Sequence, residues 1–184
     1  MSASDDLSGK RIAFIVTDGF EQVELTGPRD ALDEAGATTT LISLKGGTVR
    51  GFHHHDPGDA FDVDAVISSV YARDFDAVVL PGGVMNPDAL RTDPDVRDFV
   101  REMFLDGKTV AAICHGPWTL IDAGIVEGKL MTSWPSLKVD LTNAGALWVD
   151  VDCVMDGHII TSRNPGDIPK FNAQIIAALD GSGG

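Results

Sequence analysis

The sequence predicts an α/β protein, a three-layer sandwich in which a mainly parallel sheet is covered by helices on both faces. Short, continuously apolar segments alternate with amphipathic helical segments, and this order is typical of a parallel sheet buried on both sides. Of the 184 residues, 43% are hydrophobic and 23% are charged, which is an ordinary globular composition. The length fits one domain, because a domain takes about 150 residues.

The predicted strands are apolar runs that end at turn residues. Buried strands are expected at residues 11–16, 38–44, 76–80 and 109–113. Residues 48–64 are rich in Gly, His and Asp and predict a small hairpin at the edge. Residues 148–155 and 158–162 are expected to pair as antiparallel strands, because Asp156-Gly157 between them is typical of a tight turn.

The predicted helices begin and end at capping residues. They are expected at residues 21–35, 93–105, 117–123, 135–143 and 168–179. Asp93 and Pro94 are typical of a helix N-cap and first helical position, and Gly36 is typical of a C-cap. Pro28 predicts a kink or a restart within the first helix.

Residues 11–180 are expected to form one domain between polar tails at residues 1–10 and 181–184. The net charge of −14 disfavours nucleic acid as a partner, because such a surface repels phosphate. No stretch approaches the roughly 18 apolar residues of a membrane helix, so no membrane partner is expected. Only two cysteines and no export signal at the first residues predict a cytoplasmic protein.

Cys114 is the strongest candidate for chemistry. It follows the strand predicted at 109–113 and precedes a predicted helix, as the nucleophile does in a strand–turn–helix elbow. The positive end of that helix favours a thiolate. A free cysteine is more often a small buried hydrophobe, but the adjacent His115-Gly116 favours the functional interpretation.

Other groups are expected at the same edge of the sheet, since ligands bind at the carboxyl ends of parallel strands. His115 is a candidate base, and Asp88 could orient it or could be an ordinary acid at a helix start. Gly82 and Gly83 could hold an oxyanion together with the amide of His115.

Glu21 ends the loop after the first strand. If it is desolvated, its carboxyl group would be partly protonated and could donate a hydrogen bond to the sulfur of Cys114. Alternatively, Glu21 is an ordinary acid of the first helical turn. We expect that ordinary role for Glu24, one turn further along.

Several segments together resemble the DJ-1/PfpI family, and its PfpI-type branch of intracellular proteases and general stress proteins in particular. They are Asp18-Gly-Phe-Glu21, Leu80-Pro-Gly-Gly83, Ala112-Ile-Cys-His-Gly-Pro117, Thr132-Ser-Trp-Pro135, Asn143-Ala-Gly-Ala146 and Thr161-Ser-Arg-Asn-Pro165. The resemblance covers about residues 10–180. It implies a flavodoxin-like fold of the class I glutamine amidotransferase-like type.

The resemblance also implies roles for the candidate residues. Cys114 would be the reactive cysteine, Glu21 the acid hydrogen-bonded to it, and His115 the histidine of a triad. Asp88 would match the third member, which comes from a neighbouring subunit in that branch, although its loop is one residue longer here. A homo-oligomer, either a dimer or a hexamer, is implied.

Two function classes follow. In one, the chain is a cysteine-dependent stress-response hydrolase acting on a small carbonyl or peptide substrate, as a peptidase or a glyoxalase or deglycase. In the other, it is a redox-sensing stress protein or chaperone whose cysteine is oxidised without turnover. No cofactor is expected, because nucleotide-binding patterns are absent from the sequence. No metal is expected either, since His53 and His55 would supply only two ligands from one strand face.

Overall fold

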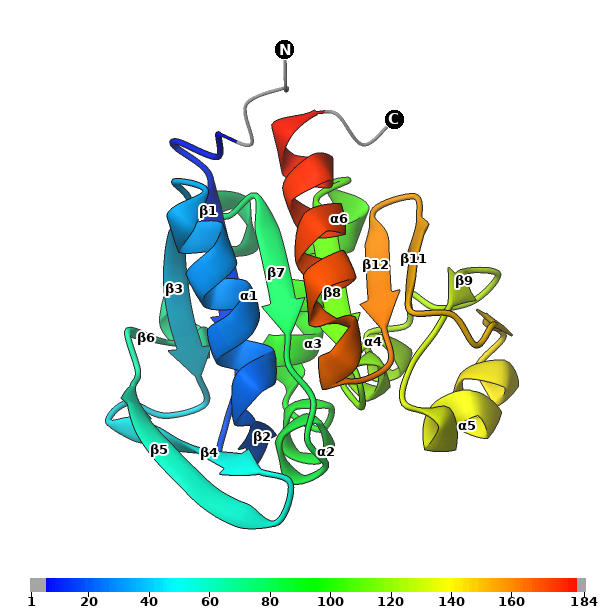
Figure 1. Ribbon diagram of the computed structural model, residues 1–184, viewed down its shortest axis with the longest axis horizontal. Coiled ribbons are helices and arrows are strands. Elements are labelled where there is room, and N and C mark those ends of the chain that lie inside the picture. The colour runs from blue at the N-terminus through cyan, green and yellow to red at the C-terminus, as the bar shows by residue number, and fades with distance from the viewer. Residues whose placement is uncertain (1–5, 182–184) are drawn as a thin grey trace.

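A seven-stranded sheet lies between two layers of helices in the computed structural model, which describes residues 6–181 (Figure 1). Its strand order is β11-β12-β8-β7-β1-β3-β6, and only β11 and β12 pair antiparallel. The strands are β1 (Arg11–Ile15), β3 (Thr38–Ser43), β6 (Ala65–Val66), β7 (Ala77–Leu80), β8 (Thr109–Ile113), β11 (Cys153–Asp156) and β12 (Ile159–Ser162). The predicted fold class is confirmed.

Helices cover both faces of this sheet. They are α1 (Gln22–Glu34), α2 (Met85–Leu90), α3 (Pro94–Leu105), α4 (Pro117–Asp122), α5 (Lys138–Asn143) and α6 (Ile168–Asp180), with short 3-10 turns η1 (Ile67–Ser69), η2 (Ala72–Asp74), η3 (Pro135–Leu137) and η4 (Pro165–Asp167). In Figure 1, α1 and α6 lie side by side in front of the sheet, and α3 lies behind it. The predicted helices all form, whereas α2 was not predicted.

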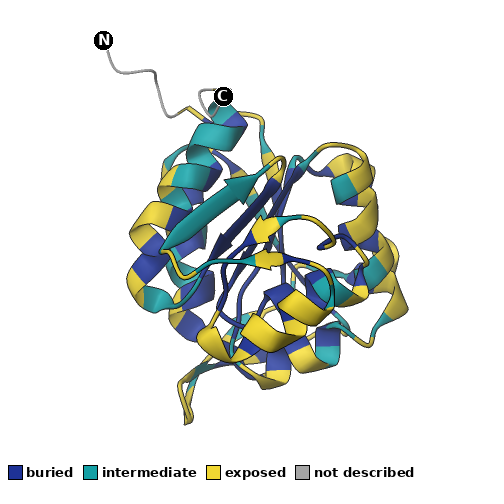
Figure 2. Cartoon of the chain, turned by 90° about the vertical axis from the view of Figure 1, so that its right-hand side faces the viewer, coloured by how far each residue is buried: buried dark blue, intermediate teal, exposed yellow. Residues whose placement is uncertain are grey.

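The two faces of the sheet bury separate cores, because successive side chains of a strand point to opposite sides. Along β1, Ile12 and Phe14 pack against the side of α1 and α6, whereas Ala13 and Ile15 pack against the side of α3 and α4. Figure 2 shows the central strands buried and the outer faces of the helices exposed. This double burial explains why these strands read as continuous apolar runs.

Local signals fix the helix ends. The Asp93 side chain accepts a hydrogen bond from the amide of Val96 at 3.1 Å, and Pro94 occupies the first turn of α3. Pro28 lies inside α1, whose residues stay helical on both sides of it. Gly36 ends that helix with a φ of +95°, a left-handed conformation that glycine adopts without a steric penalty.

Two small sheets flank the main one. The hairpin of β4 (Thr48–His53) and β5 (Asp56–Asp62) forms as predicted and adds β2 (Phe20–Glu21) in parallel. The prediction for residues 148–155 is partly wrong. Trp148 belongs to β10 (Leu147–Trp148), which pairs with β9 (Leu130–Met131), and only β11 pairs with β12.

Residues 6–10, ahead of β1, are packed against the domain. Leu7 is fully buried in the core beside α1, and its amide donates a hydrogen bond to the carbonyl of Ala35 at 2.7 Å. The predicted tail over residues 1–10 is therefore wrong for residues 6–10. Residues 1–5 and 182–184 of the two predicted tails lie outside the described residues. Within residues 6–181, no helix is long and apolar enough to cross a membrane.

Candidate active site

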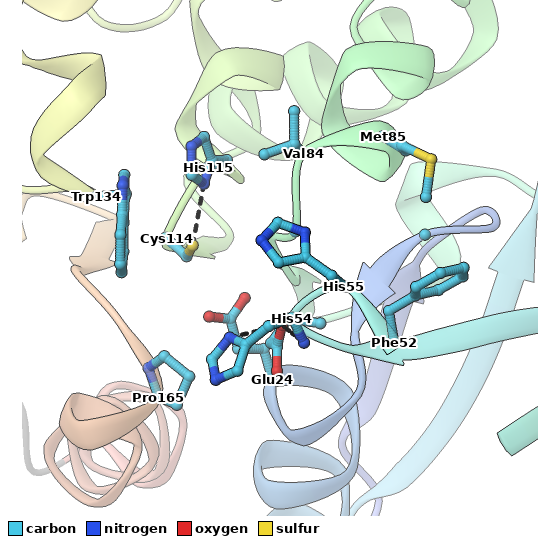
Figure 3. A pocket seen from close by; sticks show the side chains of 13 residues that line it. Glu24, Phe52, His54, His55, Val84, Met85, Cys114, His115, Trp134 and Pro165 are labelled. Atoms are coloured by element: carbon cyan, nitrogen blue, oxygen red, sulfur yellow. Dashed lines mark hydrogen bonds and ion pairs between the residues drawn. The ribbon is translucent and has the colours of Figure 1, made fainter. Parts of the chain in front are cut away.

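A cavity of about 480 Å³ opens where β1, β7 and β8 end. Its walls come from the loops after these strands, from the β4–β5 turn and from the segment before α5 (Figure 3). The lining residues are Gly19, Glu21, Glu24, Phe52, His54, His55, Gly83, Val84, Met85, Cys114, His115, Trp134 and Pro165. Four of the six residues predicted for the site line this cavity, namely Cys114, His115, Glu21 and Gly83.

Cys114 stands on the sharp turn between β8 and α4. Its φ is +63°, a left-handed conformation that is unfavourable for a residue with a Cβ, and strain of this kind is typical of functional positions. The turn is held by the hydrogen bond from the Cys114 amide to the carbonyl of Ser162, at 3.0 Å. The structure therefore has the elbow geometry that the sequence predicted.

His115 is paired with the sulfur. The Sγ atom of Cys114 lies 3.1 Å from His115 Nδ1, and Nε2 lies 3.4 Å from the hydroxyl of Ser136. The ring stacks on Trp134 and meets the edge of Trp118, at centroid distances of 5.8 and 5.2 Å. Burial lowers the pKa of His115, so the imidazole is neutral at neutral pH and can accept the thiol proton.

The structure places Glu24, and not Glu21, against the thiol. Glu24 is fully buried in the first turn of α1, and its Oε2 atom accepts the amide hydrogen of Gly82 at 2.7 Å. Its carboxyl group also interacts with the side chain of Cys114. Glu21 instead accepts a hydrogen bond from the amide of His54 at 3.0 Å. The predicted role of Glu21 as hydrogen-bond partner of the sulfur is therefore wrong, as is the ordinary role predicted for Glu24.

The protonation states of this pair follow from burial. Desolvation raises the pKa of Glu24 to about 8, so the carboxyl group is neutral at pH 7. Burial also raises the pKa of the Cys114 thiol, and the charged form of Glu24 raises it further. The predicted resting thiolate is therefore not favoured. A neutral Glu24 removes the charge that would repel a thiolate, so the thiolate can form when His115 takes the proton.

Two backbone amides face the sulfur. The N–H groups of Gly83 and His115 hydrogen-bond to Cys114 and thereby lower its pKa, in opposition to burial. They are the donors available to an oxyanion formed beside the sulfur. The amide of Gly82 is already bound to Glu24, so its predicted place in the oxyanion hole is wrong.

We expect Gly83→Ala to destabilise the protein by about 2–4 kcal/mol, because a new Cβ would overlap backbone atoms at a left-handed φ. The φ of Gly83 is +76°, and the Cβ would lie 2.9 Å from the Glu21 nitrogen and still closer to the Gly19 carbonyl oxygen. The control is Gly128→Ala, whose φ is +72° with no atom within 4 Å of the new Cβ. Urea unfolding measures both variants, and equal losses would contradict the steric argument.

Asp88 is not brought to the cavity. It is exposed on α2, and within the described part of the chain no carboxylate lies within 4.0 Å of a ring nitrogen of His115. In a single chain the His115 ring is instead positioned by Ser136 and the two tryptophans. Asp88 could act on His115 only from a neighbouring subunit.

Sequence reasoning missed Ser136, His54 and His55 as site residues. The sequence holds only weak indications of them. Ser136 directly follows Trp134-Pro135, and the two histidines lie at the turn of the predicted hairpin. Among residues 6–181, no group of three or more His, Cys, Asp or Glu side chains could hold a metal ion.

The sequence profile of the DJ-1/PfpI family matches residues 10–178. The chain belongs to the DJ-1/PfpI family. "General stress protein 18" of Bacillus subtilis is 43% identical over 175 residues, which are 94% of this chain and 99% of that protein. "Deglycase PfpI" of Pyrococcus furiosus is 37% identical over 169 residues, which are 92% of this chain and 99% of that protein.

Solved structures of DJ-1/PfpI proteins share the fold. DJ-1beta of Drosophila melanogaster superposes with a TM-score of 0.85 at 35% identity, over 94% of this chain and 91% of that one. A two-domain protein of Anabaena variabilis with DJ-1/ThiJ/PfpI-like and ferritin-like domains gives a TM-score of 0.88 at 36% identity. That match covers 95% of this chain and 49% of the other, so this chain spans about half of the two-domain protein.

Proposed function

We propose that this DJ-1/PfpI protein is a cysteine-dependent hydrolase of carbonyl compounds in which Cys114 is the nucleophile. The observation that carries the proposal is the 3.1 Å contact between Cys114 Sγ and His115 Nδ1 at a strained elbow. A nucleophile within hydrogen-bonding distance of a base is the arrangement that covalent catalysis needs. Relatives named "Deglycase PfpI" and "Putative cysteine protease YraA" support the same class of activity.

The first step is attack of the sulfur on the carbonyl carbon. The thiol proton passes to His115 Nδ1, a bond forms between Sγ and carbon, and the carbonyl electron pair moves to oxygen. The amides of Gly83 and His115 stabilise that oxyanion. The neutral carboxyl group of Glu24 keeps a negative charge away from the sulfur and can donate its proton there.

The cavity favours a small carbonyl substrate, such as an α-oxoaldehyde or a glycated adduct. At about 480 Å³ it has the size of a small-molecule pocket, and Phe52, Val84, Met85, Trp134 and Pro165 give it an apolar wall. A peptidase is the second candidate, since the relative named "Putative cysteine protease YraA" matches over 92% of this chain.

His115→Ala separates catalysis from redox sensing. We expect it to lower hydrolysis of the carbonyl substrate about 10²-fold or more, because the base is removed. The thiol should remain oxidisable by peroxide, which mass spectrometry of Cys114 detects. The control is His158→Ala, an exposed histidine between β11 and β12. Unchanged turnover in His115→Ala would contradict the role of His115 as the base. No turnover by wild type, with Cys114 still oxidised by peroxide, would favour the alternative, a stress protein whose cysteine is oxidised without turnover.

We also propose a homo-oligomer, in which Asp88 of one subunit reaches His115 of the next. The exposure of Asp88 on α2 and the absence of a carboxylate partner for His115 within the described part of one chain support this arrangement. A cytoplasmic location and a role in stress responses are part of the same proposal. They are supported by the relative named as a general stress protein.

A further inference from the structure

A second histidine–carboxylate pair lies on the cavity wall formed by the β4–β5 turn. Glu21 accepts the His54 amide hydrogen at 3.0 Å, and the same Oε2 atom lies 3.7 Å from His54 Nδ1, within ion-pair distance. The Glu21 side chain is 11% exposed, whereas that of His54 is 80% exposed. Nδ1 therefore faces a fixed carboxylate, and Nε2 remains for a water molecule or a substrate.

His54 is held in an unusual backbone conformation. Its φ is +59°, and among the described residues only Cys114 is another non-glycine residue with a positive φ. The two strained positions line the same cavity, and Figure 3 shows Cys114 and His115 on one side of it, with His54 and His55 across from them. Strain at a water-accessible imidazole on this wall favours a function for His54.

His115 has little freedom to serve the second half of the reaction. Its Nδ1 atom lies against the sulfur, its Nε2 atom faces Ser136, and its ring is bounded by Trp118 and Trp134. An acyl group on the sulfur would extend into the cavity, away from β8. His54 lies on the opposite wall of the cavity, so a water molecule held between it and the sulfur would reach this group from the side away from His115.

We propose that His54, positioned by Glu21, is the general base that activates water to hydrolyse the acyl-enzyme on Cys114. The inference rests on the proposed function. An ester or amide substrate gives the thioester when the tetrahedral adduct expels its alcohol or amine. An α-oxoaldehyde gives it when the hydrogen on the carbon bonded to sulfur moves to the neighbouring carbonyl carbon, so that the first carbon is oxidised as the second is reduced and no external oxidant is needed. Water gives a proton to His54 Nε2, and its oxygen forms a bond to the thioester carbonyl carbon. The carbon–sulfur bond then breaks, the sulfur leaves with the electron pair and takes a proton from solvent, and His54 releases its proton to solvent. The sum is a thioester plus water giving a carboxylic acid plus a thiol.

The test uses p-nitrophenyl acetate, whose coloured product reports acetylation of the enzyme and whose steady rate reports deacylation. His54→Asn removes the imidazole and retains a residue that tolerates a positive φ. The matched control is His53→Asn, an exposed histidine of β4 that is not part of the cavity lining. Glu21→Gln tests positioning, because it removes the charge while leaving an oxygen to accept the His54 amide.

We expect a burst of product from wild type and from His54→Asn, with a steady rate about 10²-fold lower in the variant. An acetyl adduct on Cys114 should accumulate in His54→Asn, and hydroxylamine, which cleaves thioesters without a protein base, should restore turnover. Glu21→Gln should slow the steady rate less and also retain the burst, whereas His53→Asn should match wild type. A steady rate of His54→Asn within twofold of wild type, with the burst intact, would overturn the role of His54 but would leave the proposed function unaffected. Absence of any acyl-enzyme in both wild type and His54→Asn, together with no release of product above the Cys114→Ser rate, would contradict the proposed function itself.

Discussion

Replacing Cys114 with serine is expected to lower turnover of α-oxoaldehydes by about 10³-fold or more, because removing a covalent nucleophile costs at least this much in comparable enzymes. The hydroxyl of serine is a far weaker acid than the thiol, and a neutral imidazole activates it poorly in a site built around sulfur. The change is nearly isosteric, so the left-handed turn and the surrounding amides should persist. The measurement is the rate of lactate formation from methylglyoxal by the purified variant.

The matched control for this variant is Cys153→Ser. Cys153 is the other free cysteine; it lies half-buried in β11 and is not part of the cavity lining. We expect it to retain the wild-type rate. Equal losses in both variants would point to a general effect of thiol removal on the fold and would contradict a specific role for Cys114.

Glu24→Gln is expected to stabilise the protein, and to do so increasingly as the pH rises. Folding raises the pKa of Glu24 from its ordinary value of 4.5 to about 8, so the folded state binds a proton that the unfolded state has lost between these values. The free energy of unfolding of wild type should therefore fall across this interval, by up to about 5 kcal/mol in total. This group's contribution to the free energy of unfolding is fully present below pH 4.5. It falls progressively between pH 4.5 and 8 and is lost above pH 8. The amide of glutamine does not titrate, so the variant avoids this loss.

Urea unfolding at pH 5, 7 and 9 measures the effect. The difference between Glu24→Gln and wild type should be small at pH 5 and largest at pH 9. The control is Glu34→Gln, an exposed residue at the end of the same helix, for which we expect no such trend. A constant difference between Glu24→Gln and wild type at all three pH values would mean that Glu24 is ionised throughout.

The location of the site could be predicted from the sequence, because strand ends are local features. The apolar run before Cys114 and the Gly-Pro after it indicate an elbow, and the parallel sheet brings it beside Gly83. The pairing with His115 could not be read from adjacency alone, since neighbouring side chains usually diverge. The left-handed φ of Cys114 is what brings the two side chains together.

The structure places Glu24, and not the predicted Glu21, against Cys114, and the reason lies beyond what a local sequence pattern contains. Glu21 ends β2, and the pairing of β2 with β4 directs it toward the hairpin turn. Glu24 lies in the first turn of α1, where side chains lean back toward the helix N-terminus, and this brings its carboxyl group to the Gly82 amide. The choice between two acids three residues apart depends on how α1 meets the sheet, which no local pattern encodes.

The most direct test of the central claim is product identification after wild-type protein is incubated with methylglyoxal. Buffer nucleophiles must be controlled, because methylglyoxal adds to them reversibly and its disappearance alone is ambiguous. A catalytic thiol at Cys114 predicts lactate in amounts far above one equivalent per subunit, with none formed by Cys114→Ser. Reversible loss of methylglyoxal without lactate, or equal lactate from Cys114→Ser, would contradict the account.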